Sequence, residues 1–103
     1  MSRQAAISPE MSECIELCRH CHFVCLNMAT GHCPEKGGRH VEAAHLRTMI
    51  VCAEMCQTAA NVMTTGSTLH RQVCAVCADI CDACISSCRD LDDMEECIHA
   101  CQR

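Results

Sequence analysis

Residues 74–88 read CAVCADICDACISSC, and their five cysteines recur at alternating steps of three and four residues. Because an α-helix turns by about 100° per residue, these steps keep every cysteine on one face. The stretch therefore predicts a helix that carries a stripe of thiols along its length. No segment of the chain alternates apolar and polar residues with the period of a strand. We therefore expect an all-α fold.

Breaker residues define a first helix and the loop after it. Ser8 and Pro9 are typical of a helix start, because a serine hydroxyl caps the first turn and proline suits its first position. Gly31 is a natural stop for this helix. Residues 32–38 (HCPEKGG) then have the composition of a loop.

Later capping residues define the remaining helices. Ser67 is the expected N-cap of the third helix, and Asp90 or Asp92 that of the fourth. We expect helices over residues of about 9–30, 39–64, 67–88 and 91–102. Four helices joined by short loops favour an antiparallel up-down-up-down bundle with a thiol-lined core. At this length the bundle would be a single domain over residues 1–103.

The composition narrows the class of protein. The chain has 103 residues, with 14 cysteines, seven methionines, seven histidines and a single aromatic residue, Phe23. Its formal net charge of −5 opposes a nucleic-acid binder held by phosphate contacts. No apolar run approaches the roughly 20 residues that span a bilayer, and residues 1–10 lack the apolar region of an export signal. We therefore expect a cytoplasmic protein, in a reducing compartment that disfavours a disulfide scaffold.

The helical phase places thirteen of the 14 cysteines on inward faces and leaves only Cys33 in a loop. The inward cysteines are Cys14, Cys18, Cys21, Cys25, Cys52, Cys56, Cys74, Cys77, Cys81, Cys84, Cys88, Cys97 and Cys101. Ordinary packing does not explain them, because each cysteine that stands in place of a large apolar side chain forgoes roughly 1.5–3 kcal/mol of stabilisation from burying that side chain. Metal–thiolate bonds would compensate, so we expect all thirteen to be metal ligands.

The predicted metal follows from the softness of the ligands. Thiolates without carboxylates select Cu(I), with zinc as the alternative. A continuous ladder of thiols suits many ions of low coordination number better than one closed tetrahedral set. Methionines and histidines that extend the stripes are further candidate ligands, although the methionines also suit gap-filling core and the histidines exposed positions at the bundle ends. These candidates are Met11, Met28, Met49, Met63, His45 and His70.

Other functions fit the same residues less well. A zinc-binding or zinc-buffering helical module would hold a few tetrahedral ions and unfold on chelation. A thiol redox sensor needs one reactive cysteine, for which Cys33 is the candidate. Cys18, Cys21 and His22 match the CxxCH haem-attachment pattern, but His22 points away from the cysteine stripe. No acid–base dyad, catalytic triad or phosphate-binding loop is present, so we do not expect an enzyme.

Four motifs make the chain similar to a known family. They are Cys14-x3-Cys18-x2-Cys21-x3-Cys25, residues 32–42 (HCPEKGGRHVE), residues 52–58 (CAEMCQT) and residues 74–84 (CAVCADICDAC). The chain resembles the bacterial copper storage proteins, in particular their cytosolic branch, over nearly its whole length. The resemblance implies a four-helix bundle that fills its interior with Cu(I) and assembles as a homotetramer. The expected partners are copper ions and a copper-delivery protein or small thiol, with neither nucleic acid nor membrane.

Two further expectations concern the outside of the bundle. The family usually extends the fourth helix with further cysteines, whereas this sequence ends at Cys101-Gln102-Arg103. We therefore expect one uncovered end, holding Met11, Cys14, Met63, His70 and Cys74. Apolar residues off the thiol stripes are expected to face outward and to support a homo-oligomer; they are Ile15, Phe23, Leu26, Ile50 and Ile80.

Overall fold

The computed structural model describes residues 7–102. Residues 1–6, in the segment where the sequence indicates no export signal, and residue 103 lie outside the described residues. The elements in chain order are α1 (Pro9–Asn27), the π-helical turn η2 (Met28–His32), α2 (Cys33–Lys36), the 3-10 turn η3 (Gly38–Val41), α3 (Ala43–Thr64), α4 (His70–Arg89) and α5 (Glu95–Gln102). Every element in residues 7–102 is helical, which confirms the all-α prediction.

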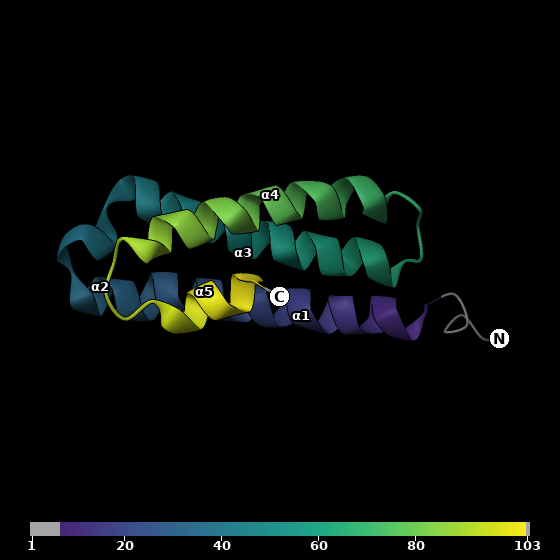
Figure 1. Ribbon diagram of the computed structural model, residues 1–103, viewed down its shortest axis with the longest axis horizontal. Coiled ribbons are helices and arrows are strands. Elements are labelled where there is room, and N and C mark those ends of the chain that lie inside the picture. The colour runs from purple at the N-terminus through teal and green to yellow at the C-terminus, as the bar shows by residue number, and fades with distance from the viewer. Residues whose placement is uncertain (1–6, 103) are drawn as a thin grey trace.

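The long helices alternate in direction around one interior. In Figure 1, α1 runs toward the end that carries α2, α3 returns beside it, α4 runs back again and α5 returns along α1. This is the predicted up-down-up-down bundle. The eight residues of α5 end near the middle of α1, so α5 covers only the half of the bundle nearest α2. We call that half the closed end, and the opposite half the open end.

The helix starts agree with the sequence in α1 and differ in α3, α4 and α5. The second bundle helix was expected from residue 39 but begins at Ala43, because the 3-10 turn η3 precedes it and Glu42 is extended (φ −61°, ψ 139°). Ser8 Oγ accepts the backbone N–H of Met11 at 3.1 Å, as predicted for the first N-cap. The third bundle helix was expected from residue 67 but begins at His70, because Ser67 Oγ instead accepts the N–H of Leu69 in a preceding turn. The fourth was expected from residue 91 but begins at Glu95, since Asp93 adopts a left-handed conformation (φ 60°) that interrupts a helix.

The stop predicted at Gly31 and the loop predicted around Cys33 are both wrong. The chain passes through Gly31 in the π-helical turn and enters α2 at Cys33, which is fully buried. Cys33 follows Cys25 by eight residues, which in an uninterrupted α-helix leaves it about 80° off the cysteine stripe. The wider π-helical turn contains one extra residue. The direction of the Cys33 side chain around the helix axis therefore shifts back by about 100°, and Cys33 points inward.

The core is built of small and sulfur-containing side chains. Alanines of α3 and cysteines of all four long helices fill it, together with a few larger residues. Ile15 was expected to face outward but is buried, because α1 packs against both α3 and α5 and so buries more than its thiol stripe. Phe23 and Ile50 are exposed as expected, whereas Leu26 and Ile80 are half-buried because they pack against the core. The oligomer that the exposed residues suggest stays a prediction. None of the helices in residues 7–102 has the length and hydropathy needed to cross a membrane.

Candidate metal centre

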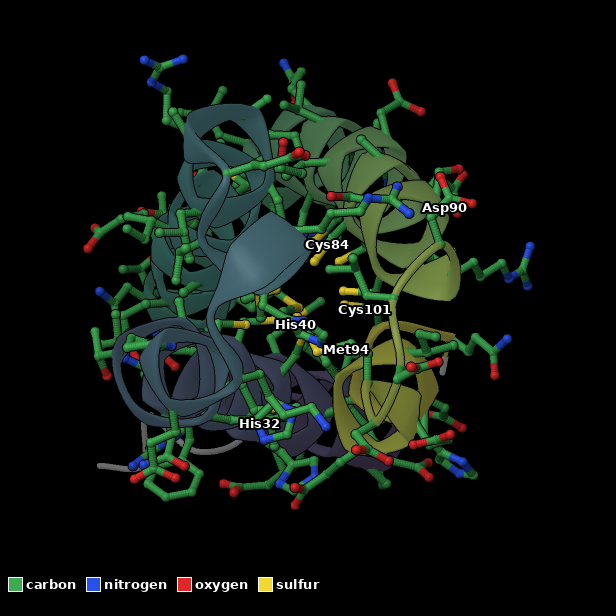
Figure 2. All side chains as sticks on the ribbon, turned by 90° about the vertical axis from the view of Figure 1, so that its left-hand side faces the viewer. His32, His40, Cys84, Asp90, Met94 and Cys101 are labelled. Carbon is green, nitrogen blue, oxygen red and sulfur yellow. The ribbon has the colours of Figure 1, made fainter. Side chains whose placement is uncertain are left out.

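The cysteine sulfurs meet along the axis of the bundle. Viewed from the closed end in Figure 2, the sulfurs gather between the helices, with Cys84 and Cys101 pointing to the centre and Asp90 at the periphery. Of the thirteen cysteines predicted to face inward, all are buried except Cys14, Cys74 and Cys81, which are half-buried. The helical phase therefore placed these sulfurs correctly.

Cys25 lies at the centre of this network. Its Sγ is 3.8 Å from that of Cys21, 3.9 Å from Cys52, 3.5 Å from Cys97 and 3.7 Å from Cys101. These partners come from α1, α3 and α5, so the sulfurs converge across helices as well as along them. The thiol core is therefore a three-dimensional cluster and not a set of separate stripes.

The cluster extends in both directions from Cys25. Toward the open end, Cys56 Sγ lies 3.7 Å from the sulfurs of both Cys77 and Cys81. Toward the closed end, Cys97 Sγ lies 3.9 Å from Cys84 and 3.8 Å from Cys88. The sulfurs thus form a continuous ladder along the bundle.

Three groups of four cysteines bring their sulfurs close enough to share metal ions. In each group, all sulfurs lie within 4.8 Å of one another. The groups are Cys21, Cys25, Cys52 and Cys101; Cys21, Cys52, Cys56 and Cys81; and Cys25, Cys84, Cys97 and Cys101. They overlap, so a thiolate that serves one group also serves its neighbour.

The sulfur separations fit metal bridging. A disulfide bond is about 2.05 Å long, far shorter than the 3.5–3.9 Å separations in the core. Two metal–sulfur bonds of about 2.3 Å separate their sulfurs by about 4 Å at a trigonal ion and about 4.6 Å at a linear one. Small side-chain rotations therefore suffice to place ions between these thiols.

Hydrogen bonds between the thiols push their pKa values apart. Hydrogen bonding from Cys101 lowers the pKa of the Cys97 thiol to about 5 and also lowers that of Cys21. Hydrogen bonding to Cys21 in turn raises the pKa of Cys101. A thiolate in this core is stabilised by neighbours that keep their protons, so the network releases protons in steps. The core can therefore present thiolate ligands without ionising all its thiols together.

The open end holds a pocket of about 520 Å³ that reaches the thiol ladder. Its lining includes all five residues expected at an uncovered end: Met11, Cys14, Met63, His70 and Cys74. Cys21, Cys56, Cys81 and Cys101 also line it, so the pocket borders all three four-cysteine groups. Glu10 and Asp82 add two carboxylates to the lining.

The closed end contains sulfur and nitrogen donors away from that pocket. His45, which the sequence allowed as an exposed residue at a bundle end, is instead 5% exposed. It is buried because it faces the bundle and pairs with Ser87 of α4. Burial lowers the pKa of His45 and raises that of the Cys33 thiol. The candidate ligands Met28 and Met49 are also buried.

Two inward residues were not among the predicted ligands. Cys33 was assigned to a loop, although the proline that follows it suits the first turn of a helix and was a usable signal. Met94 is buried at the closed end, and its spacing before Cys97 and Cys101 already placed it on their stripe. His22 of the CxxCH match has a structural role instead, because its Nδ1–H donates to the carbonyl of Ala53 at 2.8 Å.

Comparisons with known proteins agree with this architecture. The family model described as copper storage protein (Csp) matches residues 2–103. An uncharacterized cysteine-rich protein of Bacillus subtilis (strain 168), YhjQ, is 37% identical over 90 residues, which cover 85% of this chain and 76% of the relative. The crystal structure of the Nmul_A1745 protein from Nitrosospira multiformis is 55% identical in sequence, with a TM-score of 0.87 over 89% of this chain and 84% of that one.

Proposed function

The chain belongs to the copper storage protein family, and we propose that it sequesters multiple Cu(I) ions on the thiolates of its interior. The observation that carries this proposal is the set of three overlapping four-cysteine groups in the buried core. Thiolates are the ligands that select Cu(I) among the common metal ions. The proposal includes no catalytic step.

Charge balance favours Cu(I) over zinc as the stored ion. The three groups found in residues 7–102 consist of cysteines alone. One Cu(I) per thiolate leaves no net charge in the buried core, whereas a zinc ion with four thiolates leaves a charge of −2 in an apolar interior. The groups also share Cys21, Cys25, Cys52 and Cys101, so they cannot all be filled as separate tetrahedral zinc sites.

The overlap of the groups also sets the capacity. If each thiolate bridges two ions and each ion takes two thiolates, the numbers of ions and thiolates are equal. The inward cysteines then hold on the order of ten Cu(I) ions per chain. Each ion displaces a thiol proton, so loading releases protons to solvent.

The pocket at the open end is the proposed path of copper into the core. His70 and Met11 line it and offer weaker ligands than thiolates, which suits transient binding. Glu10 and Asp82 attract cations to the same pocket. We place this function in the cytoplasm, with a copper-delivery protein or a small thiol as the source of Cu(I) and a homotetramer as the assembly.

Anaerobic titration of the reduced protein with Cu(I) tests the proposal. With a competing chelator of known affinity present, the protein should retain on the order of ten ions per chain before the chelator takes up copper. Saturation at one or two ions would overturn storage. Circular dichroism of the metal-free protein tests the zinc alternative, because a zinc-stabilised module loses its helices on chelation and a preformed storage bundle keeps them.

A further inference from the structure

Three donor atoms from different side chains meet at the closed end, apart from the four-cysteine groups. Cys33 Sγ of α2 lies 3.7 Å from Nε2 of His45 and 3.8 Å from Sδ of Met49, both on α3. Cys33 and Met49 are 0% exposed and His45 is 5% exposed. Cys33 belongs to none of the four-cysteine groups found in the described part of the chain.

The two separations from Cys33 match a trigonal metal site. Bonds of about 2.3 Å to sulfur and about 2.0–2.1 Å to imidazole, at 120°, place sulfur and nitrogen about 3.7–3.8 Å apart. Two sulfurs in the same geometry lie about 4 Å apart. Both expected values agree with the measured separations from Cys33 within about 0.2 Å. His45 and Met49 are also one helical turn apart on α3, which brings their side chains to the same side.

Ser87 orients the imidazole toward this position. The Nδ1 atom of His45 lies 2.7 Å from Ser87 Oγ on α4. When Nδ1–H donates to Ser87, the lone pair of Nε2 is free and faces Cys33. A hydrogen bond from the second ring nitrogen is the usual support of a metal-binding histidine.

A separate small pocket reaches the same histidine from solvent. It has a volume of about 190 Å³, and its lining includes His45 and Ser87 together with the charged residues Arg39, Glu42 and Asp90. The open-end pocket does not include Cys33, His45 or Met49 in its lining. The closed end therefore has its own opening, which borders His45 and is separate from the open-end pocket.

From this geometry we propose that Cys33, His45 and Met49 form a mononuclear Cu(I) site at the closed end, distinct from the thiolate cluster. Binding replaces the Cys33 S–H bond by a Cu–S bond and releases one proton, while His45 and Met49 bind as neutral ligands. The charges of Cu(I) and one thiolate cancel, so the buried site is neutral, whereas a zinc ion there would leave an uncompensated positive charge. The proposal rests on the proposed storage function for its source of Cu(I).

Nitrogen NMR of the histidine rings tests the site in the unaltered protein. Reduced protein labelled with ¹⁵N is titrated anaerobically with Cu(I), and the Nε2 resonance of His45 is followed. We expect this resonance to shift as copper binds, and the shift to be lost in Cys33→Ala together with about one ion of capacity per chain. Met49→Leu conserves volume and should let the competing chelator remove the ion bound at His45 more easily. Met55→Leu is the matched control, since Met55 lies on the same helix and packs against the core but is not a candidate ligand, and it should leave the shift unchanged.

The outcomes separate this site from storage in general. Uptake of many ions with a stationary His45 resonance would overturn the closed-end site and leave storage intact. Saturation at one or two ions with a shifted His45 resonance would overturn storage and support the site. An equal shift on addition of zinc alone would overturn its assignment to a monovalent ion.

Discussion

Replacing Cys25 by alanine should reduce the copper capacity by more than one ion per chain. The sulfur of Cys25 takes part in two of the three four-cysteine groups, and its neighbours at 3.5–3.9 Å lie on its own helix α1 and on α3 and α5. If each thiolate bridges two ions, losing this sulfur leaves two ions with one thiolate fewer, and we expect the chain to lose about two ions.

Cys88→Ala is the matched control for this substitution. Cys88 is also 0% exposed, but its sulfur lies at the edge of the cluster, 3.8 Å from Cys97, and belongs to none of the three groups. Each variant removes one buried sulfur atom, at a cost of about 1 kcal/mol in the free energy of unfolding of the metal-free protein. The two variants should therefore have similar stability without metal and differ in capacity, with Cys88→Ala losing about one ion.

The assay is anaerobic Cu(I) titration against a competing chelator, accompanied by urea unfolding of each metal-free variant. Equal losses of copper from Cys25→Ala and Cys88→Ala would refute the reasoning, because the capacity would then depend on the number of thiols and not on their sharing. Full capacity in Cys25→Ala would refute it more directly, since the most connected sulfur would hold no copper.

Three other measurements test the chemistry and the fold. Burial raises the pKa of Cys33, so protons compete with Cu(I) for its sulfur. The Cu(I) affinity at Cys33 should therefore fall by up to about tenfold for each pH unit of acidification. Competition with a chelator calibrated at each pH measures this affinity, and an affinity that does not change with pH would contradict proton release. Burial lowers the pKa of His45 from 6.5, so below pH 6.5 the unfolded chain binds a proton that the folded chain does not. Urea midpoints of the metal-free protein should therefore fall as the pH drops below 6.5, with a smaller slope in His45→Gln; identical slopes would contradict this. Gly37 has φ 67°, a backbone conformation that alanine rarely adopts, although there is open space around its Cα, so Gly37→Ala should destabilise the fold by about 1–3 kcal/mol. Gly31 lies in a helical turn with equal space, so Gly31→Ala should stabilise the fold by about 0.4–1 kcal/mol. Thermal unfolding of both variants checks the sign of each change.

The thiol ladder was predictable because it depends on a local period. Steps of three and four residues fix the helix face on which a cysteine lies, and packing of the helices does not change that face. Cys25 and Cys84 are therefore buried, as the helical phase predicts. The open end was predictable for the same reason. Met11 lies at the start of α1 and His70 at the start of α4, and up-down topology brings these two starts together.

The closed end was less predictable because it depends on contacts between segments. Cys33 turns inward only because a π-helical turn shifts its phase, and such turns have no reliable sequence pattern. The burial of His45 depends on Ser87, which lies 42 residues away on another helix. Asp93 delays the start of α5, and its carboxylate pairs with Lys36 of α2 at 2.8 Å, again a contact that no local pattern indicates.

The short span of α5 has a consequence for the order in which stored ions turn over. Cys21, Cys56 and Cys81 border the wide pocket that α5 leaves uncovered, whereas Cys84 and Cys97 lie beyond it. Ions bound next to the pocket exchange with a chelator directly, while an ion bound between Cys84 and Cys97 has two ligands that lie outside the pocket lining. A loaded chain would therefore release copper in two kinetic phases, with the ions beside the pocket departing before those between Cys84 and Cys97.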